Sequence, residues 1–114
     1  MEHSDVFYKQ GNALANVGRY WEAIASYDQA LQHKPDYHQA WNNRGIALYN
    51  LGRSEEAIAS YDQALQHQPD DHKAWNNRGV VLANVGRYWE AISSYDQALQ
   101  HQPDYHQAWN NRGS

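Results

Sequence analysis

The sequence repeats itself every 34 residues, and this period limits the possible folds more than any other feature. Prolines mark it at Pro35, Pro69 and Pro103, and each proline opens a closely similar segment that ends in Trp-Asn-Asn-Arg-Gly. A fixed period of this size predicts a solenoid of stacked supersecondary units and not a globule around one closed pocket. Such a stack offers an extended surface, which favours binding over catalysis.

The 114 residues suffice for one domain, whose core is expected to be spread along the stack. We divide the solenoid, residues 4–114, into repeats 4–37, 38–71 and 72–105 and a partial fourth repeat 106–114, with an extension at 1–3 that is native or added by cloning. The partial repeat suggests a fragment of a longer array. Repeats one and three resemble each other more than the second, which points to recent duplication or to engineering from one array.

Each repeat is predicted to form two amphipathic helices. In the middle repeat the first helix is expected over residues 37–51, with Asp36 as its N-cap and Gln39 completing a capping box. Gly52 is expected to end this helix in the left-handed conformation. The second helix is expected over residues 54–67, where Pro69 stops it. Asp70 should then cap the following helix.

Apolar residues at helical spacing predict one packed stripe on each helix of the middle repeat. These residues are Ala40, Trp41, Arg44, Gly45, Ala47, Leu48 and Leu51 on the first helix and Ala57, Ile58, Tyr61, Ala64 and Leu65 on the second. Glycines recur inside the first helices, where each costs roughly 1 kcal/mol relative to alanine. That repeated cost predicts close helix–helix approach at Gly11, Gly45, Gly79 and Gly113, and at Ala23, Ala57 and Ala91 on the second helices.

This pattern resembles the tetratricopeptide repeat family. In the middle repeat the resemblance is carried by Trp41, Gly45, Leu48, Ala57, Tyr61, Ala64 and Pro69. The chain departs from the family at Arg44, Arg78 and Arg112 (usually leucine), at His33, His67 and His101 (often aliphatic) and at Ser54 (commonly tyrosine). The resemblance implies an all-α, right-handed superhelical solenoid of helix-turn-helix repeats that acts as a non-enzymatic protein–protein interaction scaffold.

The family binds its ligands on the concave face, which is lined by the first helices. On this face the residues expected to contact a peptide are Asn12, Gln39, Asn42, Asn43, Tyr49, Lys73, Asn76 and Asn77. Asparagine offers donors and an acceptor that match a peptide backbone, so Asn43, Asn77 and Asn111 could hold an extended peptide whatever its sequence. This resembles the asparagine ladders of nucleocytoplasmic glycosyltransferases. The alternative is that these asparagines are solvated surface, fixed by duplication.

A sharper alternative is the dicarboxylate clamp of chaperone-binding tetratricopeptide domains, which grips a C-terminal Asp/Glu motif. Asn12, Asn43 and Lys73 match three of its five positions. Tyr8 stands where the clamp has a lysine, and Asn77 where it has a second basic residue. Because charge-assisted bonds carry this recognition, the loss of two cations should weaken carboxylate capture severely.

Histidines form three pairs across the inter-repeat turns: His33 and His38, His67 and His72, His101 and His106. Two histidines without cysteine or a well-placed carboxylate make a poor metal site, so we expect neither metal nor cofactor. A histidine in the last turn of a helix also suits the helix dipole.

Two further residue types recur in phase with the repeat. Arg44, Arg78 and Arg112 are expected to pair with Asp28, Asp62 and Asp96, because a buried guanidinium needs a partner; anion binding by an arginine row is the alternative. Trp21 and Trp89 begin second helices and are expected on the surface.

Composition narrows the function further. The net charge of −4 and the lack of a basic run argue against nucleic acid as a partner. The chain has no apolar run near the ~20 residues of a membrane span and no visible signal peptide, which indicates a cytoplasmic location. It also lacks cysteine and a convergent catalytic set, so no enzyme is expected.

The expected partner is therefore a peptide or another protein. The alternative is a structural, engineered or excised repeat module with no specific ligand. The C-terminal end of the chain is expected to expose Trp109, Tyr95 and Leu99 without a full cover. Such an end predicts either end-to-end self-association into a homo-oligomer or fraying near the C-terminus.

Overall fold

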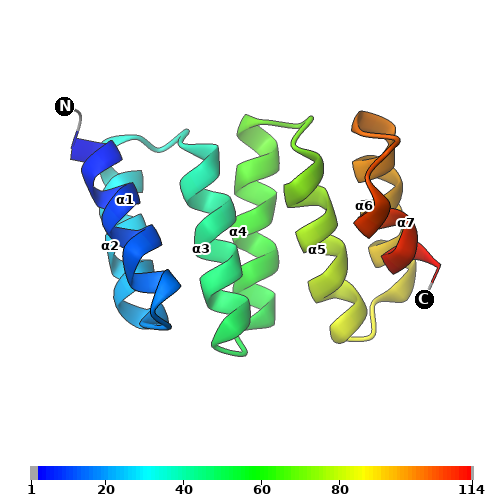
Figure 1. Cartoon of the computed structure of the whole chain (residues 1–114), viewed down its shortest axis with the longest axis horizontal. Helices are drawn as coiled ribbons and strands as arrows, with labels where there is room; N and C mark the ends of the chain where they lie inside the picture. The colour runs from blue at the N-terminus through cyan, green and yellow to red at the C-terminus, as the bar shows by residue number, and fades with distance from the viewer. Residues whose placement is uncertain (1–2, 114) are drawn as a thin grey trace.

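The computed structural model describes residues 3–113 as α-helices joined by short turns (Figure 1). The helices are α1 (His3–Asn16), α2 (Tyr20–His33), α3 (His38–Asn50), α4 (Ser54–His67), α5 (His72–Asn84), α6 (Tyr88–His101) and α7 (His106–Arg112). The predicted extension at 1–3 and the predicted end at Ser114 lie largely outside the described residues, although His3 already belongs to α1. Over 3–113 the fold is the all-α repeat solenoid that the period predicts.

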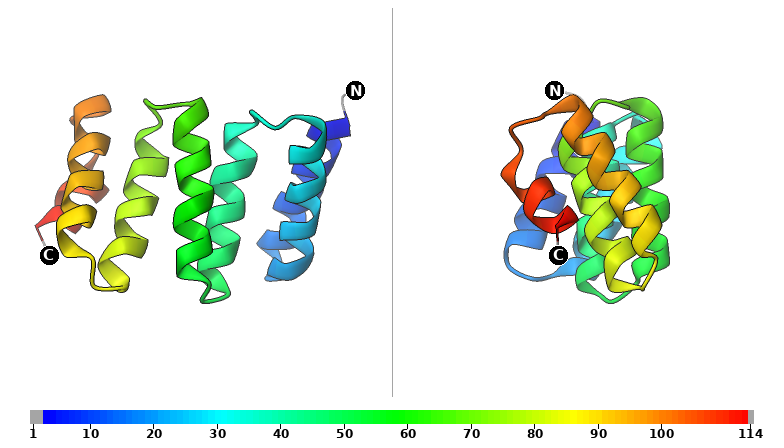
Figure 2. Two further views of the ribbon diagram at one scale, coloured as in Figure 1. Left: turned by 180° about the vertical axis from the view of Figure 1, so that it is seen from behind. Right: turned by 90° about the vertical axis from the view of Figure 1, so that its right-hand side faces the viewer.

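The helices form consecutive hairpins that stack side by side (Figures 1 and 2). The first helices α1, α3, α5 and α7 make one layer, and the second helices α2, α4 and α6 make the other (Figure 2). The stack measures 41 × 25 × 20 Å along its principal axes. Within residues 3–113 none of the helices combines the length and apolar character that crossing a membrane requires.

The core runs between the two layers. All five residues of the predicted stripe on α4 are buried, from Ala57 to Leu65. On α3 the prediction is confirmed for Ala40, Gly45, Ala47 and Leu48, whereas Trp41, Arg44 and Leu51 are only half-buried.

Glycine lets a tyrosine ring of the partner helix lie directly against each first helix. A Cβ atom added to Gly45 would lie 2.6 Å from Cε1 of the buried Tyr61, far inside van der Waals contact. The same contact joins Gly11 to Tyr27 and Gly79 to Tyr95, which confirms the predicted close approach. The prediction is wrong for Gly113, which ends α7 and faces no second helix.

The C-terminal end of α3 follows its sequence signal, whereas two predicted N-caps do not. Gly52 has φ of 79° directly after α3, and the N–H of Arg53 donates to the carbonyl of Leu48 at 2.9 Å, as in a left-handed C-cap. The capping predictions for Asp36 and Asp70 are wrong. In each loop the proline and the aspartate lie inside a turn, which is closed by the N–H of the residue after the aspartate. Tyr37 donates to the carbonyl of Lys34, and Asp71 donates to the carbonyl of Gln68. Each helix therefore starts one residue later than expected.

The actual N-caps are therefore Tyr37 and Asp71. Asp71 caps α5 because its Oδ1 accepts the backbone N–H groups of Lys73 at 3.1 Å and Ala74 at 3.3 Å. Tyr37 makes no such side-chain bond to the helix end, and the predicted capping box of Asp36 and Gln39 does not form.

Candidate functional site

Asparagines of the first helices bond to one another across the repeats. We call Asn43, Asn77 and Asn111 the asparagine row; each donates its Nδ2 to the residue one position earlier in the preceding repeat. The bonds run from Asn43 to the Tyr8 hydroxyl (3.1 Å), from Asn77 to Asn42 (3.4 Å) and from Asn111 to Asn76 (3.1 Å). One hydrogen bond therefore recurs at every junction between first helices.

The asparagine row keeps part of its bonding capacity for a ligand. Each of its members is half-buried, and the bonds across the junctions use amide N–H groups. The carbonyl oxygen of each side chain, with two lone pairs, is a further bonding position. Asn76, by contrast, is only 4% exposed, so its expected exposure on the ligand-binding face is wrong. It serves as a buried acceptor between repeats.

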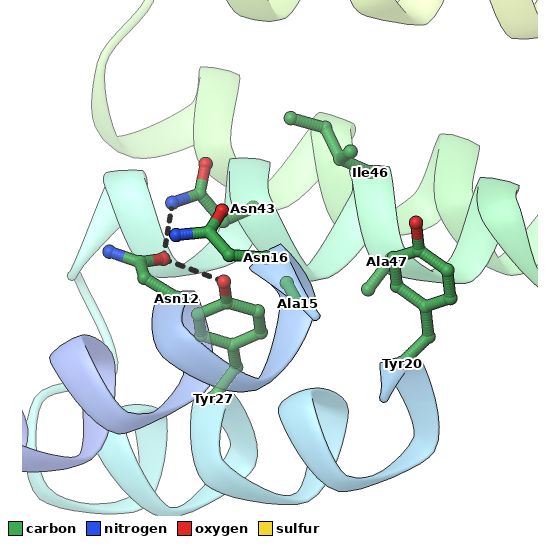
Figure 3. Close-up of a pocket in the computed structure, with 8 residues that line it drawn as sticks. All are labelled: Asn12, Ala15, Asn16, Tyr20, Tyr27, Asn43, Ile46 and Ala47. Carbon is green, nitrogen blue, oxygen red and sulfur yellow. Dashed lines mark hydrogen bonds between the residues drawn. The ribbon is translucent and has the colours of Figure 1, made fainter. Parts of the chain in front are cut away.

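The first junction carries an additional bonded group. The hydroxyl of Tyr27 donates to Oδ1 of Asn12 at 2.6 Å, and Asn43 donates to the same oxygen at 2.9 Å (Figure 3). Burial, with a smaller contribution from the neighbouring Tyr8 phenol, raises the pKa of Tyr27 to about 12. Tyr27 therefore remains a hydrogen-bond donor at neutral pH and holds Asn12 in place.

Beside this group the surface is hollowed to a volume of about 350 Å³. The walls of this first hollow come from α1, α2 and α3, and Figure 3 shows the Asn12–Tyr27–Asn43 group on one side and Tyr20 and Ala47 on the other. Its lining residues are Asn12, Ala15, Asn16, Tyr20, Tyr27, Asn43, Ile46 and Ala47. The lining combines apolar side chains with amides and hydroxyls and contains no charged group.

A second hollow of about 420 Å³ lies at the other end of the stack, between α5, α6 and α7. It is lined by Val80, Ala83, Asn84, Tyr88, Ala91, Ile92, Tyr95, Asn111 and Arg112. Six of these residues stand 68 positions after a residue of the first hollow, so both hollows occupy the same place in their repeats. The asparagine row contributes one residue to each.

A family model described as "Tetratricopeptide repeat" matches residues 8–70, 45–104 and 82–114. The chain belongs to the tetratricopeptide repeat family. The comparison with curated proteins found no match.

Solved tetratricopeptide repeat (TPR) structures superpose closely on the chain. The Arabidopsis OM64 TPR domain is 25% identical with a TM-score of 0.94, over 99% of this chain and 93% of that one. YrrB, described as a TPR protein with an unusual peptide-binding site, is 25% identical with a TM-score of 0.92, over 100% of this chain and 59% of that one. The first TPR of Spaghetti (RPAP3), bound to the HSP90 peptide SRMEEVD, is 24% identical with a TM-score of 0.94, over 96% of this chain and 87% of that one.

The other predicted contact residues of this TPR chain lie apart from the hollows. Gln39 and Lys73 are exposed in the first turns of α3 and α5, and neither lines a hollow. Asn42 and Tyr49 are half-buried on α3. The structure therefore brings together Asn12 and Asn43 and leaves Lys73 at the edge of the face.

Three arginines stand where the family usually has leucine. Each forms an ion pair with an aspartate, as predicted. Arg44 bonds to Asp28 at 2.6 Å and Arg78 to Asp62 at 2.7 Å, and Arg112 bonds to Asp96 in the same way. The predicted burial of these guanidinium groups is wrong, because the Arg44 and Arg78 side chains are 22% and 20% exposed and their partners 52%. At the edge of the core, water solvates part of each pair.

The contacts of two recurrent residue types were missed by sequence reasoning. Buried serines lie on the second helices, where Ser60 donates to the Trp41 carbonyl at 2.7 Å and Ser94 accepts from Arg78 at 2.7 Å. Each tryptophan of the Trp-Asn-Asn motif also donates its indole N–H to the proline carbonyl six residues earlier, at 2.7–2.8 Å. Recurrence at the 34-residue period was the only available signal for either contact.

The histidines and the tryptophans of the second helices lie at the surface or the repeat junctions. His33 stacks on Phe7 with ring centroids 5.8 Å apart, and His72 meets Tyr105 edge-on at 4.7 Å. Over residues 3–113, His, Cys, Asp and Glu side chains form no group of three that could hold a metal. Trp21 and Trp89 are 57% and 84% exposed, as predicted, and the guanidinium of Arg53 lies over the Trp21 ring.

Proposed function

We propose that this chain is a non-enzymatic scaffold that holds an extended peptide against the face formed by α1, α3 and α5, with Asn43 and Asn77 bonding the peptide backbone. The observation that carries the proposal is the asparagine row, in which each amide is already fixed by a bond to the preceding repeat. A side chain held in one conformation loses little entropy when it binds, so its remaining polar atoms can contribute fully to affinity. The peptide-binding site named for YrrB, which has the same fold, supports a peptide as the class of partner.

The recurrent carboxylates of the chain support a scaffold and not a catalyst. Glu22 and Glu90 bond to arginines three residues earlier at 2.6 Å, at the start of α2 and α6, and Glu56 bonds to Arg53 in the same way. Each carboxylate thus has a structural partner next to its own helix, in a position favoured by the helix dipole.

An extended backbone fits the site better than a carboxylate motif does. A dicarboxylate clamp would rely on Lys73 alone among its three cationic positions, since Tyr8 and Asn77 stand at the other two. Here Tyr8 accepts a bond from Asn43 and Asn77 donates to Asn42, so both positions serve the junctions between repeats. Neutral amides match the N–H and C=O groups of a peptide backbone.

A peptide-display selection tests the proposal. Peptides enriched on the parent chain should bind the Asn43→Ala/Asn77→Ala variant weaker by roughly 1–3 kcal/mol, or about 5- to 150-fold, because buried hydrogen bonds are lost. The matched control is Gln29→Ala/Gln63→Ala, which removes two exposed amides from the other helix layer. A second control, Asn76→Ala, deletes an inter-repeat bond behind the surface. Unchanged affinity in the Asn43/Asn77 variant, or equal loss in Asn76→Ala, would refute backbone recognition by the asparagine row.

End-to-end self-association is the second candidate, and the two end faces favour it. Val6 is 44% exposed on α1, whereas Ala40 and Ala74 at the same position of the next repeats are fully buried. At the other end the expected exposure is confirmed for Trp109 and wrong for Tyr95 and Leu99, which are buried. Tyr88 is 65% exposed at that end. If a second copy covers these faces, the mass measured by light scattering should rise with concentration, and Val6→Lys/Tyr88→Lys should abolish the rise. A constant monomer mass would exclude this candidate.

A further inference from the structure

The middle repeat carries a tyrosine where the two hollows carry alanine. Tyr49 stands 34 residues after Ala15 and 34 residues before Ala83, and these two alanines line the first and second hollow. The chain therefore contains the same structural position twice with a methyl group and once with a phenol. This difference between repeats indicates what kind of side chain the position can accommodate.

Tyr49 packs against the core with part of its surface exposed. It is half-buried and packs on the cluster that contains Leu48, Leu82 and Val81. Burial chiefly, and then the nearby Tyr49 phenol, raise the pKa of both Tyr61 and Tyr95. Tyr61 is the middle-repeat equivalent of Tyr27, which lines the first hollow. Tyr49 therefore packs, in the middle repeat, on the cluster that contains the equivalent of a tyrosine lining the first hollow.

The lining of the first hollow matches an aromatic side chain with a polar tip. Its apolar contacts come from Ala15, Ile46 and Ala47, and its polar contacts from Asn16, Asn43 and the Tyr20 phenol (Figure 3). Aromatic rings bury a large apolar area at low entropic cost, and the tyrosine hydroxyl finds partners among amides. The volume of about 350 Å³ falls among ligand pockets of about 300–1,000 Å³.

We infer that the two hollows each accept an aromatic side chain, tyrosine above all, of the peptide bound along the asparagine row. The inference rests on the proposed function, and it adds the specificity that backbone recognition lacks. Tyr49 acts as a divider that fills the middle site from within the chain. A charged side chain fits poorly, because the first hollow has no charged group to compensate its desolvation. At the second hollow the Arg112 guanidinium can also stack on the incoming ring.

Titration with N-acetyl-tyrosinamide, followed by NMR of the asparagine side-chain amides, tests this inference at each hollow separately. We expect saturable shifts at Asn16 and Asn43 in the first hollow and at Asn84 and Asn111 in the second. At the first hollow N-acetyl-glutamate amide should bind about tenfold more weakly or not at all, because its charge would be buried there without a partner. N-acetyl-leucinamide, which lacks the ring, should also bind more weakly.

Variants that copy the chain's own middle repeat make the test specific. Ala15→Tyr should abolish the shifts at Asn16 and Asn43 and leave those of the second hollow unchanged, and Ala83→Tyr should do the reverse. Ala25→Tyr adds the same ring to an exposed position of α2 and should change neither site. Each variant tests one hollow against the parent chain. If one variant fails to fold, the other variant still tests the inference.

Three results would overturn the inference: no saturable shift in the parent, equal binding of the three amides, or shifts that persist in Ala15→Tyr and Ala83→Tyr. The outcome is independent of the peptide-display selection. Peptides that depend on Asn43 and Asn77 but show no aromatic preference would uphold the proposed function and refute this inference. Tyrosinamide binding without any enriched peptide would uphold the aromatic sites and refute the proposed function.

Discussion

Replacing Gly45 by alanine should destabilise the chain, although alanine is the better helix former. In an exposed helix this change would gain about 1 kcal/mol. Here the new Cβ would lie 2.6 Å from Cε1 and 2.9 Å from Cδ1 and Cζ of Tyr61. The ring is only 1% exposed and cannot move into solvent, so α3 and α4 must separate. Overpacking of this kind costs about 1–3 kcal/mol, and the severity of the contact places it near the upper limit. The net loss should be about 2 kcal/mol.

Urea denaturation followed by circular dichroism and by tryptophan fluorescence measures this loss. Coincident transitions are required, because a stack of repeats can unfold in parts. Gly113→Ala is the matched control, since Gly113 has the same position in the repeat but meets only its own helix backbone, at 3.5 Å or more. It should leave stability unchanged or raise it slightly.

A double-mutant cycle identifies the cause. In a Tyr61→Leu background, which removes the ring, the cost of Gly45→Ala should vanish or turn into a gain. If Gly45→Ala stabilises the parent, or costs as much in the Tyr61→Leu background as in the parent, the steric account of the recurrent glycine is refuted.

Three further predictions concern single positions. Asp71→Ala should cost about 1 kcal/mol in a urea titration because it removes the cap of α5, whereas Asp36→Ala, at a position that caps nothing, should be neutral. Gly52→Ala should cost about 1–2 kcal/mol in the same assay, because its φ of 79° strains any residue with a Cβ. Since the pKa of Tyr27 is raised to about 12, the unfolded state loses its proton first, and unfolding free energy should fall as pH rises from about 10 to 12. Urea titrations across this range should show a smaller fall in Tyr27→Phe.

The sequence was sufficient for the helices because their signals are local. Glycine and proline end the helices wherever they stand, so α4 begins and ends at the predicted residues and α3 within one of them. The capping prediction failed at Asp36 because it ignored the turn that Pro35 and Asp36 form before the helix begins. That turn places its closing N–H on Tyr37, which becomes the N-cap instead.

The candidate site was predictable only in part, because its properties depend on contacts between repeats. Helical spacing placed the equivalent residues Asn42 and Asn76 on the same face of their helices, yet one is half-buried and the other is a buried acceptor. Which amide faces a neighbour depends on how far one first helix is offset against the next, and no spacing within a single helix encodes that offset. The hollow beside Ala15 was invisible for the same reason, since its walls come from three helices.

Residues at equivalent positions show that the neighbouring repeat decides a side chain's environment. The arginine that precedes a second helix contacts the residue 32 positions earlier: Arg53 lies over the Trp21 ring at 4.9 Å, and Arg87 bonds to Glu55 at 3.3 Å. Both repeats have arginine at this position, but its partner is an aromatic ring in one and a carboxylate in the other. A guanidinium group binds both kinds of partner. Trp89 has the sequence surroundings of Trp21, yet its exposure is 84% instead of 57%. Identical residues therefore acquire different contacts according to their place in the stack, and each repeat must be interpreted together with the one that follows it.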